Sequence, residues 1–89
     1  MEATGYCSCR KCCGKSDGIT ASGTQAHRGT IAVDPKVIPL GTRVYIEGMG
    51  EFRAEDVGGA IKGNKVDIWF PTHIATLNFG RKMVRVRIN

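Results

Sequence analysis

Apolar and polar residues alternate along several short runs of this chain, with the period of two that β-strands show. The clearest run is 83–88, where three aliphatic residues on one face alternate with two arginines on the other. Comparable strand-like runs, separated by turn signals rich in glycine and proline, span residues 3–9, 30–33, 42–46, 51–57 and 65–70. The pattern therefore predicts about six short strands.

One segment carries helix signals instead. Thr72 is a candidate N-cap and Gly80 a C-terminal stop, so we expect a helix over residues 73–79. Ile74 and Leu77 are expected on its packing side, because residues three apart share a helix face. A chain of 89 residues buries a limited core. About six strands and one helix therefore predict a small closed β-barrel, since closure leaves no exposed sheet edge.

A glycine-rich segment links two of the predicted strands and carries a carboxylate at each end. Between Asp56 and Asp67 lie three glycines, one asparagine and two lysines, one of which is Lys62. This composition favours a tight connection that brings both strand ends to one place. Two carboxylates in one cleft can perform acid–base chemistry on a glycosidic bond. The alternative for either aspartate is a structural turn cap that accepts backbone N–H groups.

The alternation also assigns these side chains to strand faces. In run 65–70, three apolar residues form the core face, which leaves Asp67 and Trp69 on the other side. An aromatic ring beside a carboxylate outside the core is what a sugar-binding cleft needs, and the alternative for Trp69 is ordinary packing beneath the helix. In run 51–57, strict alternation places Asp56 on the same face as Ala54, at the edge of apolar surroundings.

The basic character of the chain, with a net charge of +5, would attract either nucleic acid or an anionic cell-wall polymer. The basic residues are spread along the chain without the aromatic pattern of nucleic-acid readers, so no nucleic-acid partner is expected. No run approaches the roughly 20 apolar residues of a membrane helix, so no membrane span is expected either. His27 and His73 are isolated in the sequence and are not expected to be metal ligands.

Three segments together resemble the 3D domain, a family named for three aspartates. The segments are 30–35, 38–46 and 54–67, and Asp34, Asp56 and Asp67 stand at the family's aspartate positions. The resemblance extends over residues 3–88, so we expect one domain over residues 1–89. It implies a mainly β fold, a six-stranded double-psi β-barrel with one short helix. Relatives of the family include bacterial stationary-phase survival proteins and the catalytic barrel of membrane-bound lytic transglycosylase A.

The resemblance implies a function on the peptidoglycan glycan strand. A lytic transglycosylase cleaves the bond between N-acetylmuramic acid and N-acetylglucosamine and leaves a 1,6-anhydro product. Asp67 matches the catalytic acid/base, Asp56 the supporting carboxylate, and Asp34 a third aspartate near the same cleft. No cofactor is required for this chemistry. The alternatives are a non-catalytic wall-binding module of the expansin type and a phage- or secretion-associated wall-remodelling component.

Four residues are candidates for substrate binding. Lys15 and the loop residue Ser22 match positions that border the cleft, and Trp69 and Lys62 are the other two candidates. The expected partner is the peptidoglycan strand, and the expected location is extracellular or cell-wall associated, as a domain of a larger secreted protein. The oligomeric state stays open.

A cysteine-rich loop at residues 7–13 departs from the family pattern. Its four cysteines are Cys7, Cys9, Cys12 and Cys13. An oxidising cell-wall setting favours two disulfides. The alternatives are an all-cysteine structural zinc site, in which four thiolates would hold the loop, and free thiols.

Overall fold

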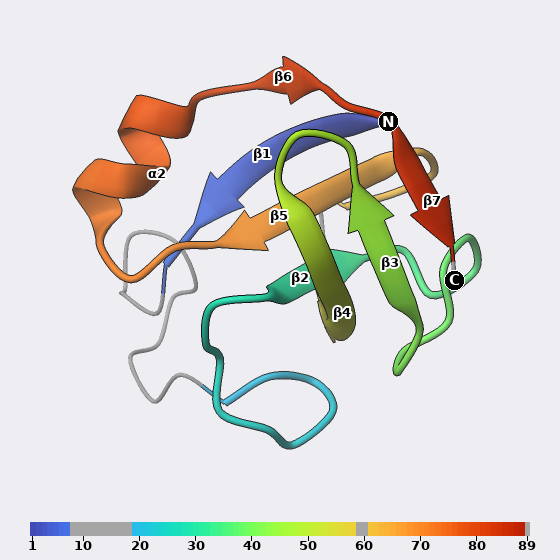
Figure 1. Cartoon of the computed structure of the whole chain (residues 1–89). Coiled ribbons are helices and arrows are strands. Elements are labelled where there is room, and N and C mark those ends of the chain that lie inside the picture. Colours follow the sequence, from blue (N-terminus) through green and yellow to red (C-terminus); the bar gives the residue numbers. More distant parts are fainter. Residues whose placement is uncertain (8–18, 59–60, 89) are drawn as a thin grey trace.

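The computed structural model describes residues 1–7, 19–58 and 61–88, which form one curled sheet of seven strands and, within these residues, a single short helix (Figure 1). Neighbouring strands follow the order β6-β1-β5-β2-β4-β3-β7. The strands are β1 (Glu2–Tyr6), β2 (Thr30–Val33), β3 (Arg43–Ile46), β4 (Gly50–Val57), β5 (Lys65–Trp69), β6 (Lys82–Met83) and β7 (Val86–Ile88).

The two edge strands of this sheet, β6 and β7, come from one stretch of chain, and β1 continues its pairing with that stretch beyond β6. The Met1 amino group donates to the Val84 carbonyl at 2.9 Å, and the Val84 N–H donates back to the Met1 carbonyl at 2.9 Å. Figure 1 accordingly places the N-terminus beside the start of β7. The expected barrel fold is confirmed, with seven strands in place of six. The difference arises because the predicted strand 83–88 is interrupted and pairs with two partners, β6 with β1 and β7 with β3.

The core lies on the inner face of the curled sheet and is built from aliphatic residues of the central strands. Ile31 and Val33 of β2 pair with Ile68 and Val66 of β5, and all four are buried. Further buried members of this cluster are Ala3, Ile38, Val44, Ile46 and Ala54. Small β-branched residues dominate because two inward faces meet across a narrow barrel, where such side chains pack densely.

A β-bulge in β4 changes the direction of its last side chains. Ile31 of β2 pairs with Ala54, but the next residue, Ala32, pairs with Asp56, so Glu55 is the extra residue. Ile31 and Ala54 face the core, and Ala32 with its partner Asp56 therefore faces outward. The prediction that Asp56 shares a face with Ala54 is wrong, because an inserted residue shifts the alternation by one.

The helix α2 (His73–Phe79) has the predicted boundaries and caps. The Thr72 hydroxyl accepts a hydrogen bond from the Ala75 N–H at 3.1 Å, and Gly80 ends the helix with φ of 67°. Its packing side differs from the prediction, because Ile74 and Leu77 are 70% and 66% exposed. The buried residue of this helix is Thr76.

Close backbone contact explains which side of α2 faces the barrel. A Cβ atom added at Gly5 of β1 would lie 3.3 Å from the Thr76 Cα and 2.8 Å from a Phe70 ring carbon. The glycine thus allows the helix to approach the strand more closely than a side chain would permit. Phe79 completes this contact, with its ring centroid 5.2 Å from that of Phe70.

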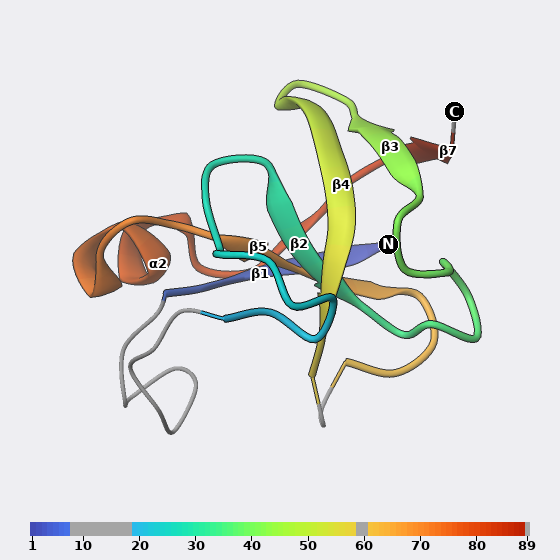
Figure 2. The ribbon, with the colours of Figure 1, turned by 90° about the horizontal axis from the view of Figure 1, so that it is seen from below.

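The connection before β2 lies along the outer surface of the sheet. Figure 2 shows residues 19–29 beside β2 and β4. The Ser22 N–H donates to the Glu55 carbonyl at 3.0 Å, and the Arg53 N–H donates to the Gly29 carbonyl at 2.7 Å. Among the described residues, the structure contains no helix long and apolar enough to cross a membrane.

Candidate functional site

Four side chains stand in register across four neighbouring strands on the outer face of the barrel. Thr4 of β1 pairs with Asp67 of β5, Asp67 pairs with Ala32 of β2, and Ala32 pairs with Asp56 of β4. Directly paired residues point to the same side of a sheet, so the two carboxylates face the same space. Their backbones are two strand spacings apart, about 9.6 Å. Ala32 lies between them in this row, and the Tyr6 side chain reaches Asp56 from β1 on the same face.

Asp67 is half-buried and has the properties of a proton donor. The Thr4 hydroxyl donates to its Oδ1 at 2.9 Å, and no other group among the described residues donates to this carboxyl. Burial raises the pKa of Asp67, the negative charge of Asp56 raises it further, and the Thr4 hydrogen bond partly opposes both. The protonated form is therefore favoured relative to an exposed aspartate, and within residues 1–7, 19–58 and 61–88 no group donates a hydrogen bond to Oδ2.

Asp56 is held as a hydrogen-bond acceptor by three donors. The N–H groups of Ala21 and Val57 donate to Oδ1 at 2.9 Å each, and the Tyr6 hydroxyl donates to Oδ2 at 3.3 Å. The donors come from β1, β4 and the loop before β2, so the carboxylate joins three parts of the chain. Asp67 accepts a hydrogen bond from one donor among the described residues, so the two carboxyl groups differ in their hydrogen-bond partners.

The extra residue of the bulge, Glu55, fastens the loop that supplies the Ala21 N–H. Its carboxylate is buried and accepts hydrogen bonds from the Thr30 hydroxyl at 2.7 Å and the Thr24 hydroxyl at 3.2 Å. His27 Nε2 lies 3.2 Å from the same carboxylate. Ser22 is exposed on this loop next to Ala21, so the structure places this predicted binding residue beside Asp56.

Asp34 follows β2 directly and makes contacts of another kind. Its Oδ1 accepts from the Lys36 N–H at 3.0 Å and its Oδ2 from the Gly63 N–H at 2.9 Å. These hydrogen bonds, with that from Gly63 the stronger, lower the pKa of Asp34, and the charge of Lys62 acts in the same direction. Asp34 thus ties the β4–β5 connection to the turn after β2, and no hydrogen bond among the described residues joins it to Asp56 or Asp67.

Three further residues were predicted to bind substrate, and the structure describes two of them. Trp69 pairs with Tyr6 across β1 and β5, so it lies on the same face as Asp67, as the alternation predicts. Lys62 is exposed on the β4–β5 connection near Asp34. Lys15 lies outside the described residues.

The cysteine predictions fall mostly outside the described residues. Cys9, Cys12 and Cys13 lie there, so the choice among disulfides, zinc and thiols stays a prediction. Cys7 is buried, with its Sγ 3.8 Å from His73 Nδ1. No group of three or more histidine, cysteine or acidic side chains within the described part of the chain could hold a metal ion.

Three residues of this site were missed by sequence reasoning, namely Thr4, Tyr6 and Glu55. The first two are far from the aspartates in sequence, and only the parallel pairing of β1 with β5 brings them together. Glu55 did have a local signal, because two adjacent acidic residues interrupt an alternating run. Such an interruption is compatible with a bulge.

The chain is similar in sequence to two proteins of known name. The chain is 48% identical over 79 residues to the cell wall-binding protein YocH of Bacillus subtilis, which covers 84% of the chain and 28% of that protein. It is 42% identical over 93 residues to the putative cell wall shaping protein YabE of the same organism, covering 99% of the chain and 22% of that protein. The chain therefore spans less than a third of the length of either relative.

The fold is similar to that of a solved enzyme. The crystal structure of the lytic transglycosylase MltA from Escherichia coli superposes with a TM-score of 0.66 and 29% identity, over 78% of this chain and 26% of that one. The model of the 3D domain matches residues 29–88, which include β2 to β7, the bulge and all three aspartates. The chain belongs to the 3D domain family.

Proposed function

We propose that this domain binds glycan strands of the bacterial cell wall and cleaves them as a lytic transglycosylase, with Asp67 as acid/base. The observation that carries the proposal is the pair of outward-facing carboxylates across Ala32, one with a raised pKa and the other held by three donors. The likeness to MltA and the names of the wall-associated relatives support the class of substrate.

The first step is protonation of the leaving group. Protonated Asp67 donates its proton from Oδ2 to the glycosidic oxygen between N-acetylmuramic acid and N-acetylglucosamine, and the bond to the anomeric carbon of the muramic acid breaks. Positive charge develops at that carbon. The Asp56 carboxylate, held in place by Tyr6 and Ala21, stabilises this charge from β4, on the far side of β2.

The second step closes a ring instead of adding water. Asp67, now a carboxylate, accepts the proton of the muramoyl C6 hydroxyl while that oxygen attacks the anomeric carbon. The product is a 1,6-anhydromuramoyl end, and Asp67 returns to its protonated form. The raised pKa of Asp67 suits both roles, since the group must donate and accept a proton near neutral pH.

The other predicted residues have supporting roles in this proposal. Trp69, on the face of Asp67, offers a ring for a sugar, while Ser22 and Lys62 border the cleft on separate connections. Lys15 stays a candidate for substrate binding. For Asp34 we propose a positioning role, because its two backbone hydrogen bonds hold the β4–β5 connection.

Digestion of purified peptidoglycan, with mass detection of 1,6-anhydromuramoyl products, tests the proposal. Asp67→Asn keeps an acceptor for Thr4 but removes the proton donor, so turnover should fall by about 10²–10⁴-fold. The matched control is Glu51→Gln, which makes the same chemical change at an exposed position of β4. If Asp67→Asn releases as much product as the wild type and keeps its fold, Asp67 is not the catalytic acid/base.

The second candidate is a wall-binding module without catalysis, favoured by the name of the relative YocH. It uses the same face and the same substrate class. Co-sedimentation with insoluble peptidoglycan without any anhydro product would favour this module over the enzyme. In either case we propose an extracellular or cell-wall location within a larger protein, as the short coverage of the relatives supports.

A further inference from the structure

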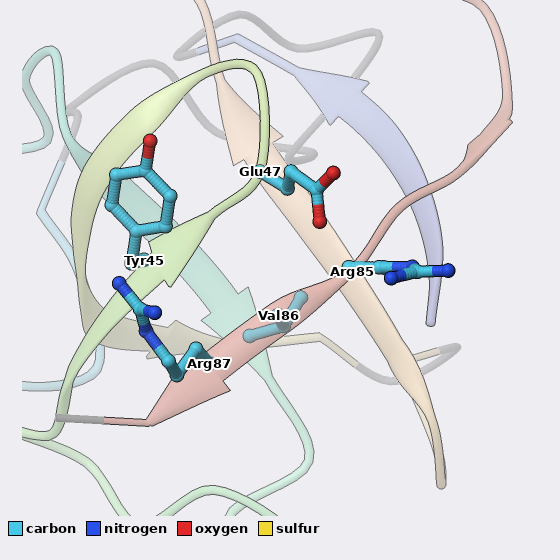
Figure 3. A pocket seen from close by; sticks show the side chains of 5 residues that line it. All are labelled: Tyr45, Glu47, Arg85, Val86 and Arg87. Carbon is cyan, nitrogen blue, oxygen red and sulfur yellow. The ribbon is translucent and has the colours of Figure 1, made fainter.

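A hollow of about 500 Å³ lies on the outer surface of the barrel, away from the row of carboxylates. It is lined by Tyr45, Glu47, Arg85, Val86 and Arg87 (Figure 3). Tyr45 belongs to β3, and Val86 and Arg87 belong to β7. Tyr45 pairs with Glu51 of β4, and Asp56 lies five residues further along the same strand. The distance along β4 from Glu51 to Asp56 is therefore about 16 Å. The hollow is therefore a separate site.

The backbone holds the groups of this hollow in place. Tyr45 and Arg87 are direct partners across β3 and β7, so their side chains leave the sheet on the same side. The Arg87 guanidinium lies 5.2 Å from the centroid of the Tyr45 ring, a cation–π contact that orients it. On the other side of the hollow, the Glu47 N–H donates to the Arg85 carbonyl at 2.9 Å.

Four arginines lie in or beside this hollow, and one carboxylate, that of Glu47, is part of its lining. Next to Tyr45, Arg43 and Arg53 stand directly opposite each other on β3 and β4. Like charges in that position destabilise a sheet. Within the described part of the chain, neither these two nor Arg85 and Arg87 have a carboxylate within 4.0 Å. All four side chains are exposed, so their guanidinium groups are accessible to an external anion.

We propose that this hollow binds an anionic sugar or polyol polymer. Arg87, beside Tyr45, and Arg85, on the opposite side of the hollow, bind separate phosphate or carboxylate groups of the polymer (Figure 3), since guanidinium groups match both geometries. The exposed Glu47 carboxylate accepts hydrogen bonds from neighbouring hydroxyl groups of the polymer. A volume near 500 Å³ accommodates one repeat unit of such a chain.

The carboxylate in the hollow decides between classes of polyanion. Glu47 repels a ligand that presents only negative charge, whereas a polymer with a hydroxyl beside each anionic group supplies the donors that this carboxylate requires. Arg43 and Arg53 extend the positive surface beyond the hollow and fit the next anionic group along the chain. Nucleic acid, which carries phosphates at high density, fits this mixture of charges less well.

Calorimetric titration of the 89-residue protein tests the site with three polymers: polyglycerol phosphate, polygalacturonate and neutral dextran. Polyglycerol phosphate supplies phosphate groups and polygalacturonate supplies carboxylates. The polymer that binds with the higher affinity therefore identifies the preferred anion. We expect binding of at least one of them that weakens with added salt, and no binding of dextran. Absence of binding to both anionic polymers, or equal binding of dextran, overturns the proposal.

The test variant is Arg85→Gln/Arg87→Gln, which changes two exposed side chains and should weaken binding about tenfold. The matched control, Arg28→Gln/Lys36→Gln, removes the same charge at two exposed positions elsewhere. Equal loss in both variants would mean a non-specific effect of net charge and overturns the site. Asp67→Asn should bind these polymers as the wild type does. The binding assay therefore tests the hollow separately from the cleavage assay, which tests Asp67.

Discussion

Removal of the Glu55 carboxylate provides the sharpest test of how the candidate cleft is built. Glu55→Ala takes away the acceptor of the Thr30 hydroxyl, which is fully buried and donates at 2.7 Å. A hydrogen bond to a charged group contributes about 1.5–3 kcal/mol, and the buried hydroxyl has no water to replace it. The Thr24 hydroxyl is exposed and can be rehydrated, so its bond contributes about 0.5–1.5 kcal/mol.

The His27 contact adds little to this total. The His27 side chain is 61% exposed, and exposed ion pairs contribute about 0–1 kcal/mol. Glu55→Ala should therefore lower the free energy of unfolding by about 2–5 kcal/mol. Glu55→Gln keeps the shape and one carbonyl acceptor, so its cost should be about 1 kcal/mol.

Urea unfolding followed by the fluorescence of Trp69, the only tryptophan, measures both values. Hydrogen exchange at the Ala21 and Ser22 amides reports on the loop and should accelerate in Glu55→Ala. The control Glu51→Ala removes an exposed carboxylate from the same strand and should change stability by no more than about 0.5 kcal/mol. A Glu55→Ala protein within that margin of the wild type would refute the reasoning.

Three further predictions concern the Asp67 carboxyl and the helix contact. Because the pKa of Asp67 is raised above its ordinary value of 3.8, the folded state binds more protons than the unfolded state between that value and the folded-state pKa, and wild-type stability falls as pH rises through this window. Asp67→Asn should thus be more stable than the wild type to urea at pH 7 but not at pH 3, and a less stable variant at pH 7 would contradict this. Thr4→Val removes the hydrogen bond that lowers the pKa of Asp67, so carbon-detected NMR titration should find that pKa higher still; an unchanged or lower value would argue against the Thr4 contact. Gly5→Ala would place a methyl group 2.8 Å from a Phe70 ring carbon and should cost about 1–3 kcal/mol by thermal unfolding, whereas an unchanged melting temperature would show that α2 can shift freely.

Local interactions of neighbouring residues determine much of this protein, and these were predictable. The strand runs and the helix follow from the period of hydrophobic residues, and the caps at Thr72 and Gly80 act within one turn of the chain. The outward direction of Asp67 and Trp69 also follows from simple alternation, because β5 is regular over its whole length. The three aspartates were identified through their resemblance to a family pattern.

Tertiary structure decided the features that depend on residues distant in sequence. The bulge in β4 rotates Asp56 to the outer face, and its position depends on pairing with β2 as well as on the residues of β4. The side of α2 that packs was decided by Gly5, some 70 positions earlier, where the strand permits close approach. Asp34 was grouped with the other aspartates by pattern, and only the fold shows that its hydrogen bonds join two connections. The physical reason is the same in each case: propensity and periodicity act along the chain, whereas a carboxylate's partners and its pKa are set by the strands that pairing places beside it.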